Sequence, residues 1–276
     1  MLVLPVPGGL PIERRDVVDA ITFDFGNTLV PVDRAGLRRV VERTGERVGE
    51  RLGPFPTQQF LTIWAEERER QFRAEVPRFR EVDLADRFVR VLARLRGLSA
   101  PPADVEWDQE VAARHSAPAE IEWAVETYSA AFVELMPAPA AVEPLLERLA
   151  RRHVLAILSN WPLAVTVDRF AAAHGWDRHL RAIVVSQRAG IIKPHPAIFA
   201  AALEAVGGPS ADRALHVGDD WAADVVGAKR AGWRAAFLDA RPADSPLPSS
   251  ERDDDVVPDV EIRSLSELEA HLRPDE

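Results

Sequence analysis

Five short apolar segments constrain the fold of this chain more than any other feature. Most of them contain β-branched residues, as strands buried on both faces of a sheet do. They cover residues 17–23, 154–158, 182–185, 214–217 and 235–238. Helical patterns separate the later segments, so the chain predicts βα units and a mostly parallel sheet, in a Rossmann-like three-layer α/β core.

A helical region interrupts this pattern between the first and second segments. Strand-like runs disappear there, and charged amphipathic helices take their place. Its position suggests a lid over the carboxyl edge of the sheet. The chain is therefore divided into an irregular N-terminal extension (1–15), an α/β core domain (16–33 and 138–276) and an inserted helical cap domain (34–137). Within the core, residues 241–258 are rich in Pro, Ser and Asp and are expected to form a solvated loop, before a last short strand and helix.

Composition excludes several classes of function. Forty-four acidic and thirty-four basic residues give a formal net charge of -10, which repels nucleic acid and anionic membranes. The chain contains no cysteine, so it has no disulfides, thiolate metal ligands or catalytic thiols. No apolar run approaches the length of a transmembrane helix. We expect a soluble, cytoplasmic protein without nucleic-acid or membrane partners; neither the substrate nor the oligomeric state can be read from the sequence.

Polar residues follow four of the apolar segments, and a parallel sheet would bring them to one edge. Asp24 is the candidate nucleophile. With Asp219, and with or without Asp224, it would form a carboxylate cluster suited to a hard cation such as Mg²⁺. Lys193 and the Ser159 hydroxyl could hold the oxygens of a phosphoryl group.

Lysine is rare in this chain, which draws attention to Lys193. Only Lys193 and Lys229 are lysines, and the other 32 of the 34 basic residues are arginines. A compact ammonium and a planar guanidinium differ in shape and donors, so Lys193 stands where arginine would not serve.

Structural interpretations stay open for several of these residues. Ser159 and Asn160 are also typical of a helix N-cap. Asp220 and Asp224 could support the site rather than bind the metal. His195 lies in a Pro-rich turn and His216 in a predicted buried strand, and these positions favour structural roles for both.

Residues 17–272 resemble the haloacid dehalogenase-like hydrolases that carry a helical cap between their first and second motifs. That family shares Asp-x-Asp-x-Thr, a Ser or Thr after the second strand, a distant Lys, and an acidic pair near Gly-Asp. The corresponding residues here are Asp24 and Thr28, Ser159, Lys193, and Asp219 with Asp224.

The resemblance implies hydrolysis of a small phosphorylated metabolite through an aspartyl-phosphate on Asp24. Lys193 and Ser159 would steady the phosphoryl group, with Thr28 and Asn160 beside them. Mg²⁺ would be held by Asp24, the Gly26 carbonyl, and Asp219 with or without Asp224.

The chain departs from the family pattern at Gly26, where phosphatases of the family usually carry a second aspartate that transfers protons. General acid-base catalysis is worth about 10²–10⁴ in rate, so its loss weakens an enzyme without abolishing it. We therefore expect a preference for leaving groups that depart as anions, and faster hydrolysis of alkyl phosphates by Gly26→Asp. Two alternatives stay open: a metal-independent dehalogenase, and a catalytically weak phosphate-binding regulatory protein.

Overall fold

The computed structural model describes residues 18–253 and 255–272, so the predicted N-terminal extension lies outside the described residues. In this part of the chain, six strands form one sheet in the order β3-β2-β1-β4-β5-β6, and every neighbouring pair is parallel. The strands are β1 (Ala20–Phe23), β2 (Val154–Ser159), β3 (Ala182–Val185), β4 (Ala214–Gly218), β5 (Arg234–Leu238) and β6 (Val260–Ile262). The predicted α/β class is confirmed, and the sheet is parallel throughout rather than mostly parallel.

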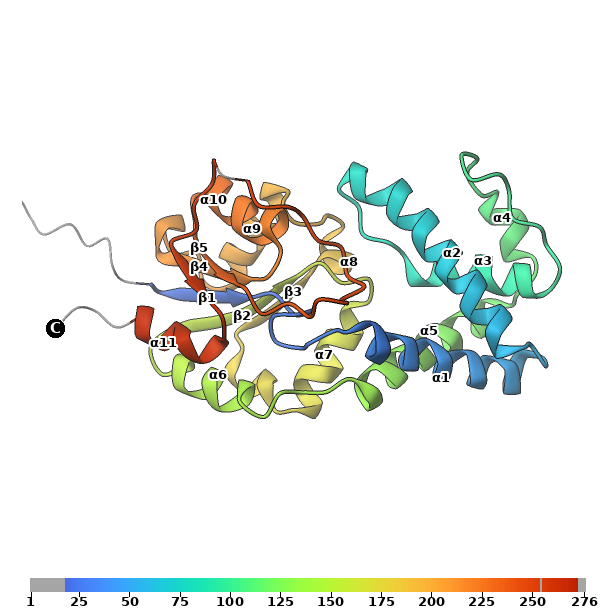
Figure 1. The fold of residues 1–276 in the computed structure, drawn as a ribbon, viewed down its shortest axis with the longest axis horizontal. Coiled ribbons are helices and arrows are strands. Elements are labelled where there is room, and N and C mark those ends of the chain that lie inside the picture. The colour runs from blue at the N-terminus through green and yellow to red at the C-terminus, as the bar shows by residue number, and fades with distance from the viewer. Residues whose placement is uncertain (1–17, 254, 273–276) are drawn as a thin grey trace, which may run out of the picture.

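Helices cover both faces of the sheet and complete three layers (Figure 1). One face packs against α6 (Val142–Ala150), α7 (Ala164–Ala173) and α11 (Leu268–His271). The other packs against α9 (Pro196–Ala205) and α10 (Gly227–Arg230), and the short α8 (Ser186–Ala189) follows β3. Both faces of the central strands are therefore buried, which explains why their sequences are continuously apolar.

Six α-helices lie between β1 and β2 in the sequence, and the first five of them form a separate group beside the core in Figure 1. They are α1 (Arg34–Leu52), α2 (Thr57–Glu75), α3 (Leu84–Leu95), α4 (Gln109–Ala113) and α5 (Pro118–Leu135). Local signals set several of their starts: Asp33 and Asp83 accept hydrogen bonds from the first turns of α1 and α3, and Pro118 opens α5. None of the described helices is long and apolar enough to cross a membrane.

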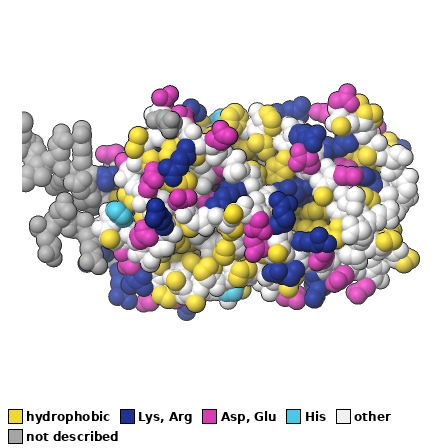
Figure 2. Space-filling view, viewed as in Figure 1, with side chains coloured by type: hydrophobic (Ala, Val, Ile, Leu, Met, Phe, Trp, Pro, Cys, Tyr) yellow, Lys and Arg dark blue, Asp and Glu magenta, His cyan; other side chains and the backbone are white. Residues whose placement is uncertain are grey.

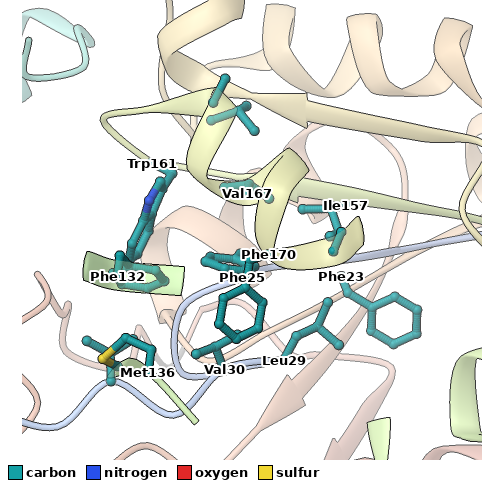
Figure 3. Close-up of a cluster of buried hydrophobic side chains, with 14 of the residues drawn as sticks. Phe23, Phe25, Leu29, Val30, Phe132, Met136, Ile157, Trp161, Val167 and Phe170 are labelled. Carbon is teal, nitrogen blue, oxygen red and sulfur yellow. The ribbon is translucent and has the colours of Figure 1, made fainter. Parts of the chain in front are cut away.

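A cluster of aromatic side chains joins this helical group to the core (Figure 3). Phe132 of α5 packs against Trp161 and Phe170, with ring centroids 5.2 and 6.0 Å apart. Phe25, which follows the candidate nucleophile, completes the cluster 5.2 Å from Trp161. The loop after β1 is thus anchored by the packing of Phe25, which fixes the backbone on either side of it.

Charged side chains of both signs are distributed over the surface. On the face shown in Figure 2, Lys and Arg side chains are interspersed with Asp and Glu side chains. The net charge of -10 is therefore not gathered into one acidic patch on that face.

Candidate active site

The sheet order places the candidate residues at a topological switch point. Strand β1 pairs with β2 on one side and with β4 on the other, and open α/β sheets bind ligands beyond the carboxyl ends of such strands. Asp24 directly follows β1 and Asp219 directly follows β4, while the Asp24 backbone N–H donates to the Val217 carbonyl over 2.9 Å. Carboxylate oxygens of Asp24, Asp219 and Asp224 all lie within 4.8 Å of one another. The structure therefore brings together the acidic residues that the sequence singled out.

Lys193 lies at the centre of the site and is 2% exposed. Its Nζ donates to Asp24 Oδ1 over 2.8 Å, to Asp224 Oδ1 over 2.6 Å and to the Leu158 carbonyl over 2.9 Å. Burial alone would lower the pKa of Lys193, but the carboxylates of Asp224 and Asp24 raise it above its ordinary value. Lys193 is thus a fixed cation beside the candidate nucleophile, and its three donors reach three different acceptors.

Asp224 is held in place by the π-helical turn Trp221–Val226 and by its hydrogen bonds. One oxygen, Oδ2, accepts from the Asp220 backbone N–H over 2.8 Å, and Oδ1 accepts from Lys193. A Cβ at Gly218 would lie 2.2 Å from the Asp224 Cγ, so only glycine leaves room for this carboxylate. Burial raises the pKa of Asp224, but Lys193 and the hydrogen bond from His216 outweigh it and hold that pKa well below the usual range.

The two histidines named in the sequence have structural positions. His216 is buried in β4, where its ring lies between Thr22 Oγ1 (2.8 Å) and Asp224 Oδ1 (3.0 Å). It therefore helps to orient Asp224, a contact that the strand pattern alone did not reveal. His195 accepts a hydrogen bond from the Ala197 N–H at the start of α9 and caps that helix.

Asp24 and Asp219 have raised pKa values because they are crowded and buried. Burial, opposed by the charge of Lys193, raises the pKa of Asp24 to about 6. Burial and the neighbouring Asp24 and Asp224 carboxylates raise the pKa of Asp219 to about 8. Asp219 also accepts from Thr28 Oγ1 over 3.4 Å. A bound cation that prefers oxygen ligands would stabilise the charged form of carboxylates packed this closely.

Ser159 and Asn160 follow different patterns of hydrogen bonding. Ser159 ends β2, and its Oγ is buried without a hydrogen-bond partner among the described residues. Asn160 accepts from the Lys193 backbone N–H over 2.7 Å and donates to the Lys193 carbonyl over 3.0 Å. Neither caps the next helix, because the N-cap of α7 is Leu163, which makes no side-chain cap bond. The Ser159 hydroxyl thus lies at the site, where its only influence is a weak one that lowers the pKa of Asp24, and Asn160 fixes the loop that carries Lys193.

Residues 241–250 form a loop, as predicted, and half of them are exposed, but the loop folds back over the site rather than lying wholly in solvent. We call residues 241–250 the covering segment; it crosses in front of the sheet edge toward α2 in Figure 1. Arg241 Nη1 donates to Asp219 Oδ2 over 3.0 Å, and its Nη2 donates to the Leu247 and Pro248 carbonyls. Further hydrogen bonds join Asn27 to Ser245, Ser250 to Asp220, and Arg68 of α2 to the Pro246 carbonyl. No spacing or motif in the sequence marks these contacts.

Leu247 of the covering segment occupies the space beside Gly26. A Cβ at position 26 would lie 2.7 Å from Leu247 Cδ1 and 3.1 Å from Trp161 Cζ3. Real side chains do not approach this closely. An aspartate at position 26 therefore needs Leu247 to move, a constraint that the sequence did not show.

A cavity of about 310 Å³ extends from the carboxylate cluster to the inserted helices. Asp24 and Lys193 line it from the core, and Arg68, Arg87 and Tyr128 line it from α2, α3 and α5. Cavities of this size, with apolar walls and a few polar groups, bind small metabolites.

The family model for haloacid dehalogenase-like hydrolases matches residues 18–232. The chain therefore belongs to this family of hydrolases.

Its curated relatives include phosphatases. It is 31% identical over 136 residues to the pyrimidine 5'-nucleotidase YjjG of Escherichia coli (strain K12), a match that covers 49% of this chain and 56% of the relative. It is 33% identical over 132 residues to the phosphoserine phosphatase of Thermus thermophilus, covering 47% of this chain and 49% of the relative. The chain thus spans about half the length of the curated relatives it matches.

Solved structures of the family share the fold over nearly the whole chain. The 2-haloacid dehalogenase from Pseudomonas syringae pv. Tomato DC3000 aligns with a TM-score of 0.64 and 23% identity, over 93% of this chain and 98% of that one. At this identity the likeness establishes the fold alone.

Proposed function

We propose that this hydrolase removes phosphoryl groups from a small phosphorylated metabolite, with Asp24 as nucleophile and Mg²⁺ as cofactor. The observation that carries the proposal is the buried Lys193 ammonium, which contacts Asp24 and Asp224 beside the Asp219 carboxylate. The phosphatase relatives support the same chemistry.

In this proposal each residue of the site has a defined task. An Asp24 oxygen forms a bond to phosphorus while the bond between phosphorus and the leaving oxygen breaks. Lys193 and the free Ser159 hydroxyl donate to the phosphoryl oxygens that gain charge. Asn160 holds the Lys193 backbone, and Thr28 supports Asp219. Water then hydrolyses the acyl phosphate and regenerates the Asp24 carboxylate.

The chemistry of the carboxylate cluster fits a magnesium ion. Three carboxylates within 4.8 Å of one another offer the oxygen donors that this cation prefers. Asp24, the Gly26 carbonyl and Asp219 would hold the ion. Both oxygens of Asp224 already accept hydrogen bonds, so its main task in this proposal is to orient Lys193. When bound, Mg²⁺ supplies positive charge that neutralises the phosphoryl oxygens.

The inserted helices are proposed to form a cap domain over residues 34–137, with the core in 16–33 and 138–276. Support comes from the cavity, whose walls combine core residues with residues of α2, α3 and α5. Such a cap excludes water from the reacting groups and supplies the contacts that select the substrate.

Gly26 gives the proposed enzyme a preference for good leaving groups. Neither Gly26 nor Leu247, which fills the space beside it, can protonate a leaving oxygen. The leaving groups of acyl phosphates and of phosphate esters of acidic phenols depart as stable anions and need no such proton.

Hydrolysis of aryl phosphates with graded leaving-group pKa tests the proposal, with and without EDTA. We expect Mg²⁺-dependent rates that rise steeply as the leaving-group pKa falls. A flat dependence, with chemistry shown to limit the rate, contradicts the absence of a general acid. Dehalogenation of a 2-haloacid that EDTA leaves unchanged would instead establish the metal-independent alternative.

A further inference from the structure

Arg87 of α3 is a buried cation that forms no ion pair with a carboxylate among the described residues, although the charge of Glu81 acts on it and its guanidinium lies 5.1 Å from the centroid of the Trp64 ring. It is 3% exposed, and its Nε donates to Gln71 Oε1 over 2.8 Å. Its Nη2 is buried and makes no hydrogen bond to any described residue. Burial lowers the pKa of Arg87 to about 10, which still leaves it charged at neutral pH. A buried charge without a partner is costly, so this position favours a ligand that brings an anion.

Arg68 of α2 lines the same cavity and also has no ion pair among the described residues. Its guanidinium lies 4.6 Å from the centroid of the Phe72 ring, and its Nη2 donates to the Pro246 carbonyl of the covering segment. Burial lowers the pKa of Arg68. The cavity thus carries two cations at its cap side.

Several other arginines on these two helices have acidic partners, whereas Arg90 of α3 donates to Gln109 Oε1 over 3.0 Å. On α2, Arg73 contacts Glu69 at 2.9 Å, and on α3, Arg94 contacts Glu66 and Glu67 at 2.5 and 2.7 Å. In a chain with more acidic than basic residues, carboxylate partners are plentiful. The two arginines that line the cavity are therefore left without them in the place where a ligand would bind.

The walls around these arginines strengthen their attraction for an anion. Apolar side chains line the cavity and keep the local dielectric constant low; they are Leu37, Phe72, Val76, Trp161, Ile192 and Leu247. Glu81 also lines the cavity, and its charge raises the pKa of Arg87, but its oxygens accept from Ser186 Oγ and the Val82 N–H and form no ion pair with either arginine. Glu81 thus compensates the charge of Arg87 only in part and makes no hydrogen bond to its guanidinium.

We propose that Arg87, with Arg68, binds a carboxylate of the substrate, so that the substrate class is a small phosphorylated carboxylic acid. This rests on the proposed function, since the phosphoryl group would occupy the Asp24 and Lys193 end of the same cavity. A guanidinium matches the planar carboxylate with paired donors, and a cavity of about 310 Å³ suits a short chain between the two groups. A neutral distal group would leave both guanidinium groups without a direct ion-pair partner.

Binding of phosphonates tests the subsite without turnover, because their carbon–phosphorus bond resists a phosphatase. Phosphonoacetate, 3-phosphonopropionate and 4-phosphonobutyrate are compared with alkylphosphonates of equal chain length by calorimetry, with Mg²⁺ present. We expect at least one carboxylate-bearing probe to bind at least about ten-fold more tightly than the alkylphosphonate of equal chain length.

Three variants separate the subsite from general effects of charge. Arg87→Met and Arg68→Met keep the side-chain stems but lose the guanidinium, and Arg73→Met is the matched control because Arg73 is exposed and paired with Glu69. Arg87→Met should remove most of the preference for the carboxylate and leave alkylphosphonate affinity unchanged. Arg73→Met should bind both series as the wild type does.

The outcomes distinguish this proposal from the proposed function. A wild-type protein that binds both series equally at every chain length overturns the subsite, whether or not the variants fold. So does a preference that survives intact in Arg87→Met and Arg68→Met. A preference that depends on Arg87, in a protein that hydrolyses no phosphate ester, supports the subsite and contradicts the phosphatase.

Discussion

The contact between position 26 and Leu247 predicts that restoring the aspartate alone gives less than its full benefit. A Cβ at position 26 would lie 2.7 Å from Leu247 Cδ1, about 1 Å inside the usual carbon–carbon contact distance. Overpacking costs about 1–3 kcal/mol in a tight core and less here, because Cδ1 is the end of a half-buried side chain, but Leu247 or the new carboxylate must still shift. A correctly placed general acid is worth about 10²–10⁴ in rate. Gly26→Asp alone should therefore give a smaller gain on alkyl phosphates than a general acid with free space around it.

The double variant Gly26→Asp/Leu247→Ala should recover that gain. Alanine removes the Cδ1 atom that meets position 26, and Leu247 is only half-buried, so the fold should tolerate its loss. We expect turnover of an alkyl phosphate to rise by about 10² or more over wild type, while turnover of an aryl phosphate with an acidic leaving group changes little. Leu247→Ala alone is the control and should show no gain.

The prediction is tested by steady-state hydrolysis of both substrates by the wild type, the two single variants and the double variant. Circular dichroism verifies that each protein is folded. A folded double variant that gains nothing on the alkyl phosphate would show that a carboxylate at position 26 is not the missing group. A single Gly26→Asp variant that gains as much as the double one would show that Leu247 is no obstacle.

Three further results follow from the packing and charges of the site. Without metal, the protein should lose thermal stability as the pH rises from about 5 to about 8. The pKa of Asp219 is about 8 in the folded state, so Asp219 stays protonated over this range. In the unfolded chain Asp219 has already released its proton, and the rising pH therefore favours unfolding. Mg²⁺ should recover more stability at the upper end of that range, and stability that rises with pH in EDTA would contradict this. Arg241→Gln removes the guanidinium that pairs with Asp219 and would compete with Mg²⁺ for this carboxylate. Mg²⁺ should therefore raise the melting temperature of the variant more than that of the wild type. A smaller rise would show that Arg241 does not compete with the metal. Gly218→Ala places a Cβ 2.2 Å from Asp224 Cγ and should cost at least about 1–3 kcal/mol in urea unfolding, and an unchanged midpoint would refute the packing argument.

The sequence predicted the sheet well because buried parallel strands leave a clear pattern. Residues 20–23 and 214–218 are almost wholly apolar since both faces of β1 and β4 are covered. Once these strands are parallel neighbours, Asp24 and Asp219 must meet at one edge. The rarity of lysine was equally informative, because the single Lys193 Nζ atom donates to three different acceptors, as a compact ammonium can.

Contacts between distant segments could not be predicted in the same way. The covering segment has no periodicity, and its bond from Arg241 to Asp219 depends on how a Pro-rich loop turns back. Asn160 illustrates a related limit, since its residue type suits a helix cap, yet tertiary structure directs it to the Lys193 backbone. The unpaired state of Arg87 depends on which side chains surround it after α2 and α3 have packed.

Phosphate release from acetyl phosphate or an aryl phosphate, by wild type and Asp24→Asn with Mg²⁺ or EDTA, tests the central claim most directly. The Asn variant keeps the shape of the side chain but lacks the nucleophilic carboxylate, and it controls for contaminating phosphatases. We predict release by the wild type that requires Mg²⁺ and disappears in Asp24→Asn. Release that persists in Asp24→Asn, or that EDTA leaves unchanged, would contradict the assignment of Asp24 as the nucleophile of a Mg²⁺-dependent phosphatase.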